Sequence, residues 1–399
     1  MNQFLRLLLL SGMLSVCLGC SKTPESVDLA GDLYARIQEE LIMAQPGDVI
    51  EIPAGEYRFD RPLSLDGISG ITIRGAGMEK TILSFLDQKT GAEGLKITAD
   101  SVTIEDLTVQ DTNGDCIKLQ DCTGVTLRRV KTTWTGGAKG SNGGYGLYPV
   151  ACTNVLIEEC EASFASDAGI YVGQSTNVVV RDCYAHHNVA GIEIENCINS
   201  EVYGNRAEEN TGGILVFDLP DLPVVNGHTT KVYRNQIIGN NHKNFAPKGN
   251  IVGIVPPGTG IILLAAKKVV VYENDIRDHK TFGTAIASYQ MTQKPWENEE
   301  YDPFSYDITI RDNTYERKKA LPDLSSDFGK MVNMVFKGRP QDILYDGILP
   351  DTTDGNPNPL NICIDQSGDD LRFANVDAAN DFDNVQTDLA PYACVGMVQ

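Results

Sequence analysis

Short runs of alternating apolar and polar residues recur through the middle of the chain, and each run is too short for a helix. Residues 169–172, 178–180 and 183–185 are three such runs in one unit. The units begin at Gly94, Cys116, Gly146, Gly169, Gly191, Gly213, Gly260 and Gly283. These starts are separated by 22, 30, 23, 22, 22, 47 and 23 residues, so the base period is 22–23 residues and two intervals carry insertions.

Three short strands per unit predict an all-β fold, a right-handed parallel β-helix of about ten rungs. Stacking rungs about 4.8 Å apart lets each backbone group pair with the rung above or below it, and alternate side chains form inward columns. A leucine-rich repeat has a similar period, but its leucine consensus and helical segments are absent from the sequence.

Cysteine and asparagine residues fall into two columns of this register. The first column lies six residues after a unit start and contains Cys122, Cys152, Ser175 and Cys197. The second follows the second strand and contains Cys160, Cys183, Asn205, Asn235, Asn274 and Asn313, which predicts an asparagine ladder. Because a buried cysteine packs as a small apolar residue, we predict six buried free thiols, at Cys116, Cys122, Cys152, Cys160, Cys183 and Cys197. Cys363 and Cys394 lie outside the repeats and are predicted to form a disulfide.

Both ends of the predicted solenoid, residues 28–318, need a cover, since an exposed sheet edge is a template for aggregation. Residues 27–44 place Leu29, Leu33, Ile37, Leu41 and Ile42 at helical spacing, which predicts a capping helix. Residues 319–399 lose the repeat and are rich in Asp, Asn and Pro. We expect them to pack on the last rungs, and a disordered tail is the alternative.

The first residues predict export. Arg6 precedes an apolar run, so residues 1–19 are predicted to be a signal peptide and residues 20–27 a tether. Gly19-Cys20 resembles a bacterial lipobox, which implies lipidation of Cys20 and a membrane anchor. Ser21, rather than Asp, after this cysteine resembles the sorting signal of enterobacterial outer-membrane lipoproteins, which implies an outer-membrane protein that is periplasmic or surface-exposed. A plain secretory signal that is cleaved nearby is the alternative.

The net charge of the chain limits the classes of binding partner that we expect. The chain has 33 basic and 54 acidic residues, a net charge of −21, so nucleic acid is an improbable partner. Such a surface keeps an exported protein soluble, and it could also collect Ca²⁺ or a basic protein.

Outward columns bring the candidate chemistry together. The third residue of successive units gives Lys118, Tyr148, Tyr171 and Glu193. The column two residues further on gives Gln120, Val150, Gly173, Glu195 and Phe217. Tyrosines offer ring faces for sugars, and we expect Gly173 to leave space, so the pattern predicts a carbohydrate-binding groove. Insertions at 135–145 and 218–257 are expected to wall it, unless they are merely tolerated surface loops.

Simpler interpretations stay open for these residues. Outward charges are usually solvated, and Asp115, Asp167 and Asp218 lie at turns, where Asp is common.

Two resemblances point to carbohydrates. Residues 45–57 and 71–77 resemble the N-terminal part of right-handed β-helix polysaccharide lyases, and this likeness spans about residues 28–315. Residues 145–150, Tyr-Gly-Leu-Tyr-Pro-Val, resemble the Tyr-Gly-Phe-Asp-Pro-His motif of mannuronan C5-epimerases, with Tyr148 in place of Asp and Val150 in place of His. Residues 191–196 and 213–220 resemble segments of a family of exported parallel β-helix proteins.

The resemblance implies a lyase or C5-epimerase acting on an acidic polysaccharide. Such a reaction needs a cation for the uronate carboxylate and groups that accept and donate protons. Lys118 could be the cation, and Tyr145, Tyr148, Tyr171 or His187 could transfer protons. Glu193 and Glu195 could hold Ca²⁺ or act as a glycosidase pair; no cofactor is certain.

Two non-catalytic roles compete with an enzyme. One is a cell-envelope scaffold that docks a partner protein through the acidic surface, the two insertions or the C-terminal segment. The other is periplasmic help in the maturation of a metal cofactor, which a resemblance in fold to some accessory proteins of copper enzymes implies. The lack of clustered His or Met ligands in the sequence counts against it.

Overall fold

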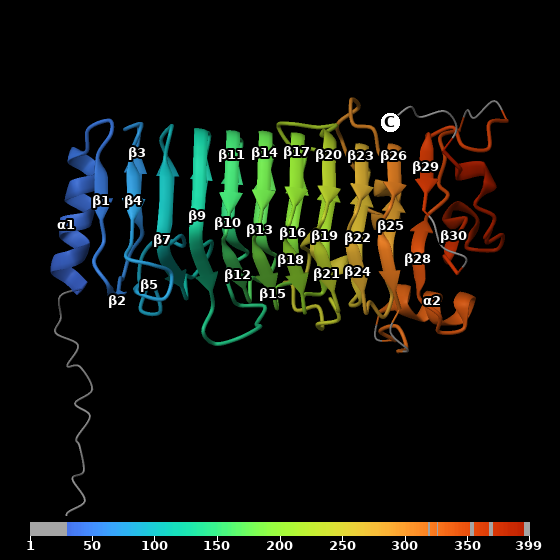
Figure 1. Cartoon of the computed structure of the whole chain (residues 1–399), viewed down its shortest axis with the longest axis horizontal. Helices are drawn as coiled ribbons and strands as arrows, with labels where there is room; N and C mark the ends of the chain where they lie inside the picture. Colours follow the sequence, from blue (N-terminus) through green and yellow to red (C-terminus); the bar gives the residue numbers. More distant parts are fainter. Residues whose placement is uncertain (1–29, 318–319, 325, 352–354, 367–369, 395–399) are drawn as a thin grey trace, which may run out of the picture.

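The computed structural model describes residues 30–317, 320–324, 326–351, 355–366 and 370–394. The predicted signal peptide, tether and lipidation site Cys20 lie outside the described residues. Within the described part, the chain winds into an elongated solenoid with helix α1 (Ala30–Met43) at one end and the C-terminal segment at the other (Figure 1). No described helix is long and apolar enough to span a bilayer.

All named strand pairs of the solenoid are parallel, and the strands form two sheets. The first sheet has 11 strands, which confirms the expectation of about ten rungs. It contains β3 (Leu63–Asp66), β6 (Leu95–Thr98), β8 (Ile117–Gln120), β10 (Tyr145–Val150), β13 (Ala168–Gly173), β16 (Ala190–Glu195), β19 (Gly212–Phe217), β22 (Thr259–Leu264), β25 (Phe282–Ala287), β28 (Gln341–Tyr345) and β30 (Phe373–Asn375). We call it the site sheet.

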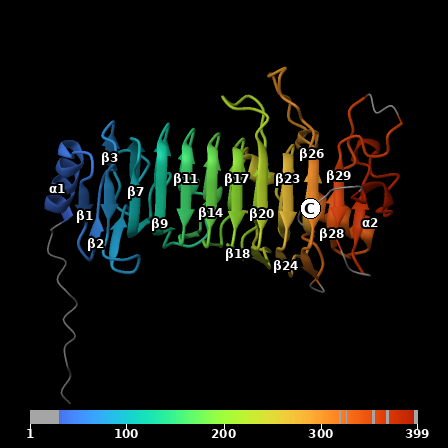
Figure 2. The ribbon, with the colours of Figure 1, turned by 45° about the horizontal axis from the view of Figure 1, so that its top comes forward.

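The second sheet has 19 strands and bends across a corner, so most turns contribute a longer and a shorter strand. It contains β1 (Val49–Glu51), β2 (Gly55–Arg58), β4 (Thr72–Arg74), β5 (Thr81–Ser84), β7 (Thr103–Gln110), β9 (Thr123–Thr133), β11 (Thr153–Glu158), β12 (Glu161–Ser163), β14 (Thr176–Arg181), β15 (Tyr184–His186), β17 (Ile198–Tyr203), β18 (Arg206–Glu208), β20 (His228–Tyr233), β21 (Gln236–Ile238), β23 (Lys267–Tyr272), β24 (Asp275–Arg277), β26 (Tyr306–Arg311), β27 (Thr314–Glu316) and β29 (Ile362–Asp365). Three strands per turn therefore match the repeat (Figure 2).

Helix α1 covers the first rung, as predicted. Leu33, Ile37 and Leu41 are buried on one face of the helix. The hydroxyl of Tyr34 donates to the carbonyl oxygen of Pro62 at 2.9 Å, and Gln38 exchanges hydrogen bonds with the backbone of Ser64. The apolar spacing of the helix thus shields the edge that the first turn would otherwise expose.

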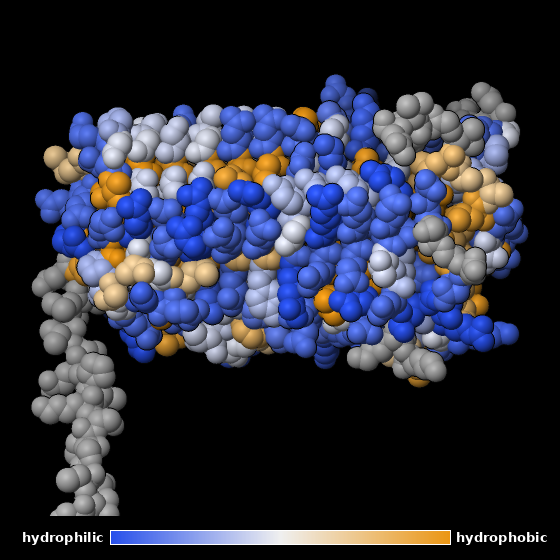
Figure 3. Space-filling view, in the orientation of Figure 1, coloured by the Kyte–Doolittle hydropathy of each residue, from blue (hydrophilic) through white to orange (hydrophobic). Residues whose placement is uncertain are grey.

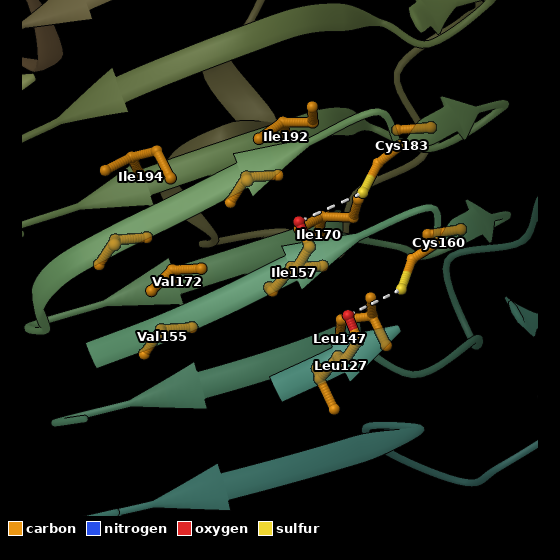
Figure 4. Packing of buried hydrophobic residues seen from close by; sticks show 14 of the residues in the cluster. Leu127, Leu147, Val155, Ile157, Cys160, Ile170, Val172, Cys183, Ile192 and Ile194 are labelled. Carbon is orange, nitrogen blue, oxygen red and sulfur yellow. Dashed lines mark hydrogen bonds between the residues drawn. The ribbon is translucent and has the colours of Figure 1, made fainter. Parts of the chain in front are cut away.

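Apolar side chains and thiols fill the interior in stacked layers (Figure 4). The thiols of Cys160 and Cys183 donate to the carbonyl oxygens of Leu127 and Ile157 one rung below. The six cysteines predicted to be free and buried are so, and the predicted disulfide joins Cys363 to Cys394.

Two asparagine ladders run along corners of the solenoid. The predicted ladder is confirmed, since the side-chain amides of Asn205, Asn235 and Asn274 each donate to the next asparagine oxygen at 2.9–3.0 Å. A second ladder, not predicted, joins Asn188, Asn210 and Asn240 in the same way. These amides pair buried polar groups that would otherwise be costly.

Charged and aromatic residues stack on the outward face of the second sheet. One column alternates in sign through Glu51, Arg74, Glu105, Arg128, Glu158 and Arg181. It continues into three stacked rings, Tyr203, Tyr233 and Tyr272, whose centroids are 4.8 Å apart. Opposite charges on neighbouring rungs favour this register over a slipped one. Hydrophilic residues predominate over the face shown in Figure 3.

The C-terminal segment extends the solenoid beyond the predicted boundary at residue 318. Strand β28 pairs with β25, β29 with β26, and β30 with β28, so this segment adds to both sheets as well as packing at the end. Helix α2 (Asp327–Phe336) lies between the last repeat and β28. Long polar connections separate these strands, and they hide the 22–23-residue period in the sequence.

Candidate functional site

The predicted columns lie on the outward face of the site sheet. Tyr148 pairs with Lys118 on the neighbouring rung, and Tyr171 pairs with Glu193. The ammonium nitrogen of Lys118 lies 5.1 Å from the ring centroid of Tyr148. Inward-facing Leu147, Ile170 and Ile192 fill the core below and hold these strands in place (Figure 4).

Three phenol rings meet at the centre of this face. The ring centroid of Tyr145 lies 4.5 Å from that of Tyr148 and 4.4 Å from that of Tyr171, and the last two are 5.1 Å apart. We call these residues the tyrosine cluster. The sequence named all three as proton-transfer candidates, and the fold brings them together.

Part of the predicted groove is covered, which corrects the expectation that both insertions wall it at the sides. Lys118 and Tyr148 are half-buried, but Tyr171, Glu193 and Glu195 are only 3%, 1% and 7% exposed. Residues 241–256, which we call the covering segment, pack over them and bury Val252 and Val255 in the same apolar cluster as Tyr171. The second insertion is therefore a roof over this part of the sheet rather than a side wall.

Gly173 does not leave open space, which corrects a second expectation. The ring of Tyr171 leans across it, so that the phenol donates to Oε1 of Glu195 at 2.6 Å. A β-carbon at position 173 would lie 2.2 Å from the hydroxyl oxygen of Tyr171. The glycine is needed because the tyrosine occupies the space above it.

Gly173→Ala should therefore displace Tyr171 and break its bond to Glu195. We expect a loss of about 1–3 kcal/mol in the free energy of unfolding, the usual cost of overpacking. Urea denaturation measures it, with Gly253→Ala as the control: neither glycine has a positive φ, and a β-carbon at position 253 would come no nearer than 3.8 Å to another residue, the carbonyl oxygen of Pro247. Equal effects of the two changes would show that crowding by Tyr171 is not the cause.

Two aspartates that the sequence explained as turn residues join the site. Oδ1 of Asp115 accepts a hydrogen bond from the backbone N–H of Tyr145 at 3.2 Å. Oδ2 of Asp167 accepts one from the side-chain amide of Asn250 at 2.8 Å. A β-carbon on Gly144 would lie 3.6 Å from Asp115 Oδ1 and 3.8 Å from Asp167 Cβ, so the two carboxyls flank this glycine. Asp115, Asp167, Glu193 and Glu195 form what we call the acidic cluster.

Burial makes this cluster hold protons near neutral pH. It raises the pKa of Asp115 to about 6. It raises the pKa of Asp167 and of Glu195 to about 7, and mutual repulsion among the carboxylates adds to the effect. The pKa of Glu193 is also raised by burial, and its Oε2 has no hydrogen-bond partner in the described structure. Groups that titrate close to the working pH are suited to proton transfer.

Burial and the neighbouring carboxylates also keep the phenols of Tyr145 and Tyr148 protonated. Burial, then the neighbouring carboxylates, raises the pKa of Tyr145 well above its usual value, and burial raises that of Tyr148 to about 12. Near neutral pH both hydroxyls are therefore proton or hydrogen-bond donors, and a carboxylate of the acidic cluster is the better base.

His187 makes its contacts elsewhere. Its Nδ1 lies 2.8 Å from Nδ1 of His186, its Nε2 lies 2.8 Å from Glu209, and its ring packs near Phe164 and His242. None of these partners belongs to the tyrosine cluster, so the structure does not bring His187 into that group.

Metal ligation finds no support in the described residues. Among them, no group of three or more His, Cys, Asp or Glu side chains is arranged to hold a metal ion. Binding of Ca²⁺ through Glu193 and Glu195 stays a prediction from the sequence.

Comparison with known proteins agrees with the β-helical fold of the chain. Residues 93–243 match the family model of the right-handed beta helix region. The chain is a right-handed parallel β-helix. Three solved structures share this architecture. The A-module of the mannuronan C-5 epimerase AlgE4 from Azotobacter vinelandii is 16% identical, with a TM-score of 0.57 over 86% of this chain and 91% of that one.

The other two are more distant in sequence. The Dettilon tailspike protein is 12% identical, with a TM-score of 0.51 over 87% of this β-helix and 57% of the tailspike chain. The DFA-IIIase from Arthrobacter chlorophenolicus A6, in complex with GF2, is 12% identical, with a TM-score of 0.50 over 80% and 89% of the two chains. No curated protein matches the sequence. At such identities the likeness shows the fold alone.

An apolar cleft lies on the far side of the covering segment. It has a volume of about 650 Å³, and its floor is the outward face of β19, β22 and β25. Phe217, Leu264, Phe282, Phe328 and Met331 are among its lining residues. Phe217 pairs with Glu195, so the cleft begins one rung beyond the acidic cluster.

Proposed function

We propose that this β-helix binds an acidic polysaccharide on the outward face of the site sheet and acts on it by proton transfer. The observation that carries the proposal is the grouping of Lys118, Tyr145, Tyr148 and Asp115 at the margin of the covering segment, where all four are half-buried. This arrangement supplies a cation, two phenols and a carboxyl of near-neutral pKa, with Asp167 behind them.

Recognition of a uronate would come from the open rungs. Lys96 is exposed and pairs with Lys118 on the next strand, so two ammonium groups stand on one column. They can neutralise sugar carboxylates, while the ring of Tyr148 next to Lys118 offers a face for stacking. These are the only two basic residues among Ser64, Lys96, Lys118, Tyr148, Tyr171 and Glu193, the first six outward positions of that column.

The reaction that best suits these groups is removal of the proton at C5 of a uronate. Asp115, as a carboxylate, would accept this proton, while Lys118 stabilises the negative charge that develops on the sugar carboxyl. The protonated phenols of Tyr145 and Tyr148 would donate either to the departing glycosidic oxygen, which gives an unsaturated uronate, or to the opposite face of C5, which gives the epimer. The similarity in fold to a mannuronan C-5 epimerase supports this class of reaction.

Activity should pass through a maximum between about pH 6 and 7. Asp115, with a pKa of about 6, must lose its proton to act as the base, so the rate rises through that pH. Asp167 and Glu195, with pKa values of about 7, become charged above it and repel an acidic substrate, so binding weakens. In a pH series of kcat/KM, Asp167→Asn should move the alkaline limb upward. An unchanged limb would contradict this role.

Binding tests the proposal without assuming catalysis. Titration calorimetry of the form that begins after residue 20 against alginate, pectate and glycosaminoglycans should find one class that binds, and Lys118→Ala should weaken it. Lys80→Ala, an exposed cation on a turn outside the site sheet, is the matched control. Failure to bind any of these glycans would overturn the proposal.

The burial of Tyr171, Glu193 and Glu195 favours a second candidate, a non-catalytic envelope protein that docks a partner. In that case the cluster only anchors the covering segment. A stoichiometric partner that co-purifies from membranes equally well with Lys118→Ala and Tyr148→Phe would support this candidate.

We also propose an outer-membrane location through lipid on Cys20. Labelling with radioactive palmitate, with Cys20→Ala as the control, tests the anchor.

A further inference from the structure

We propose that the covering segment is a stop at one end of the polysaccharide groove, so that the site receives the end of a sugar chain and does not bind along its middle. This inference rests on the proposed function and names the part of the polymer that the same site takes. It is carried by the exposure of successive rungs, by the contacts of the covering segment, and by the chemistry of the surface beyond it.

The column of outward side chains that contains Lys118 and Tyr148, which we call the site column, changes from exposed to buried at one rung. Ser64 and Lys96 are exposed, and Lys118 and Tyr148 are half-buried. The next three residues of the column are Tyr171, Glu193 and Leu215, which are 3%, 1% and 0% exposed. A polymer lying along the solenoid axis therefore finds open rungs up to Tyr148 and a closed surface from Tyr171 onward.

The covering segment is braced internally and attached at the point where the column closes. The side-chain amide of Asn244 donates to the carbonyl oxygens of Val252 and Val255, both at 2.9 Å, which ties the segment into a compact loop. Asn250 bonds Asp167 beside the tyrosine cluster. A β-carbon on Gly140 of the first insertion would lie 2.9 Å from the carbonyl oxygen of Phe245, so the two insertions meet.

The surface beyond the stop does not continue the groove. The apolar cleft offers sugar hydroxyls few partners, because most of its lining side chains are apolar and its polar ones are Thr292, Gln293 and Ser326. In the opposite direction the column stays open as far as Ser64, whose backbone bonds Gln38 of helix α1. Binding positions for sugars are thus available only on the α1 side of the tyrosine cluster.

The terminal sugar would meet polar groups at the stop. Asp115 is half-buried there, and Asp167 and Asn250 form the end wall. Behind them Oε2 of Glu193 is buried without a partner, an unpaired polar atom that a hydroxyl entering on a small movement of the segment would pair. An internal sugar has a further residue attached at that side, which would collide with the wall.

A length series tests the stop. The probes are size-fractionated chains of whichever uronate glycan binds, prepared from hexamers to long polymers and titrated by calorimetry with wild-type protein. The inference predicts one protein per chain at every length, and a loss of binding when one of the two chain ends carries a bulky label. A number of bound proteins that grows in proportion to chain length would overturn it.

The same series separates the two ideas. No binding at any length contradicts the proposed function itself, whereas binding at many places along one chain leaves that function standing and removes only the stop. Replacing residues 245–254 by a short Gly-Ser linker should convert end binding into binding along the chain. If that variant does not fold, the wild-type series still decides.

Discussion

Asp115→Asn is expected to lower kcat on the bound uronate glycan by about 10²–10⁴-fold, the usual contribution of a positioned general base. Asparagine keeps the size of the side chain and can still accept the 3.2 Å hydrogen bond from the backbone of Tyr145. It cannot take up a proton from the sugar. The affinity for the glycan should therefore change little while turnover is lost, which stopped-flow or product assays at saturating substrate measure.

Asp121→Asn is the matched control for this change. Asp121 lies at the other end of β8 in the same turn, is exposed, and has a φ of 57° that asparagine accepts readily. Its substitution should leave kcat unchanged. If Asp115→Asn retains wild-type turnover, or if the control loses as much, Asp115 is not the base.

Lys267→Ala should destabilise the folded protein by about 3–5 kcal/mol, the cost of leaving a buried carboxylate without its partner. The ammonium of Lys267 is fully buried and lies 2.6 Å from Oδ2 of Asp218, whose side chain is 2% exposed. It also donates to the carbonyl oxygens of Ala265 and Asp302 at 2.7 and 2.8 Å. Alanine removes all of these bonds and leaves a cavity.

Chemical denaturation measures the free energy of unfolding of Lys267→Ala and of two further variants that serve as its controls. Lys231→Ala breaks an exposed ion pair with Glu201, in which the two side chains are 49% and 36% exposed, and should cost less than about 1 kcal/mol. A double change, Lys267→Met with Asp218→Asn, should recover much of the loss, because it removes both charges together and keeps an oxygen that accepts the backbone N–H of Gly227. Equal destabilisation by Lys267→Ala and Lys231→Ala would contradict the buried pair.

Most of the fold could be predicted from the repeat in the sequence. The unit starts, with a base period of 22–23 residues, determine which residues share a column. The observed pairing of Tyr148 with Lys118 and of Tyr171 with Glu193 follows that register. The asparagine ladder was equally visible, because stacked amides recur at the period. The second ladder repeats the same 22- and 30-residue spacings, from Asn188 to Asn210 and Asn240, and could have been found by them.

Contacts outside the period could not be predicted. Asn250 meets Asp167 across 83 residues of sequence, and nothing in the spacing of an insertion says where it packs. The burial of Tyr171 and Glu193 follows from that packing, so it was missed too. Asp115 and Asp167 looked like ordinary turn residues, since their near-neutral pKa values arise from burial by segments distant in sequence.

The most direct test of the account is product formation. The protein that begins after residue 20 would be incubated with alginate, pectate and glycosaminoglycans near pH 6.5, following the absorbance of unsaturated uronate and the inversion of C5 by NMR. We expect a product from one of these glycans that is lost in Asp115→Asn and reduced in Lys118→Ala and Tyr148→Phe. A product that persists unchanged in all three variants, or binding with no product under any condition, would contradict proton transfer at this site.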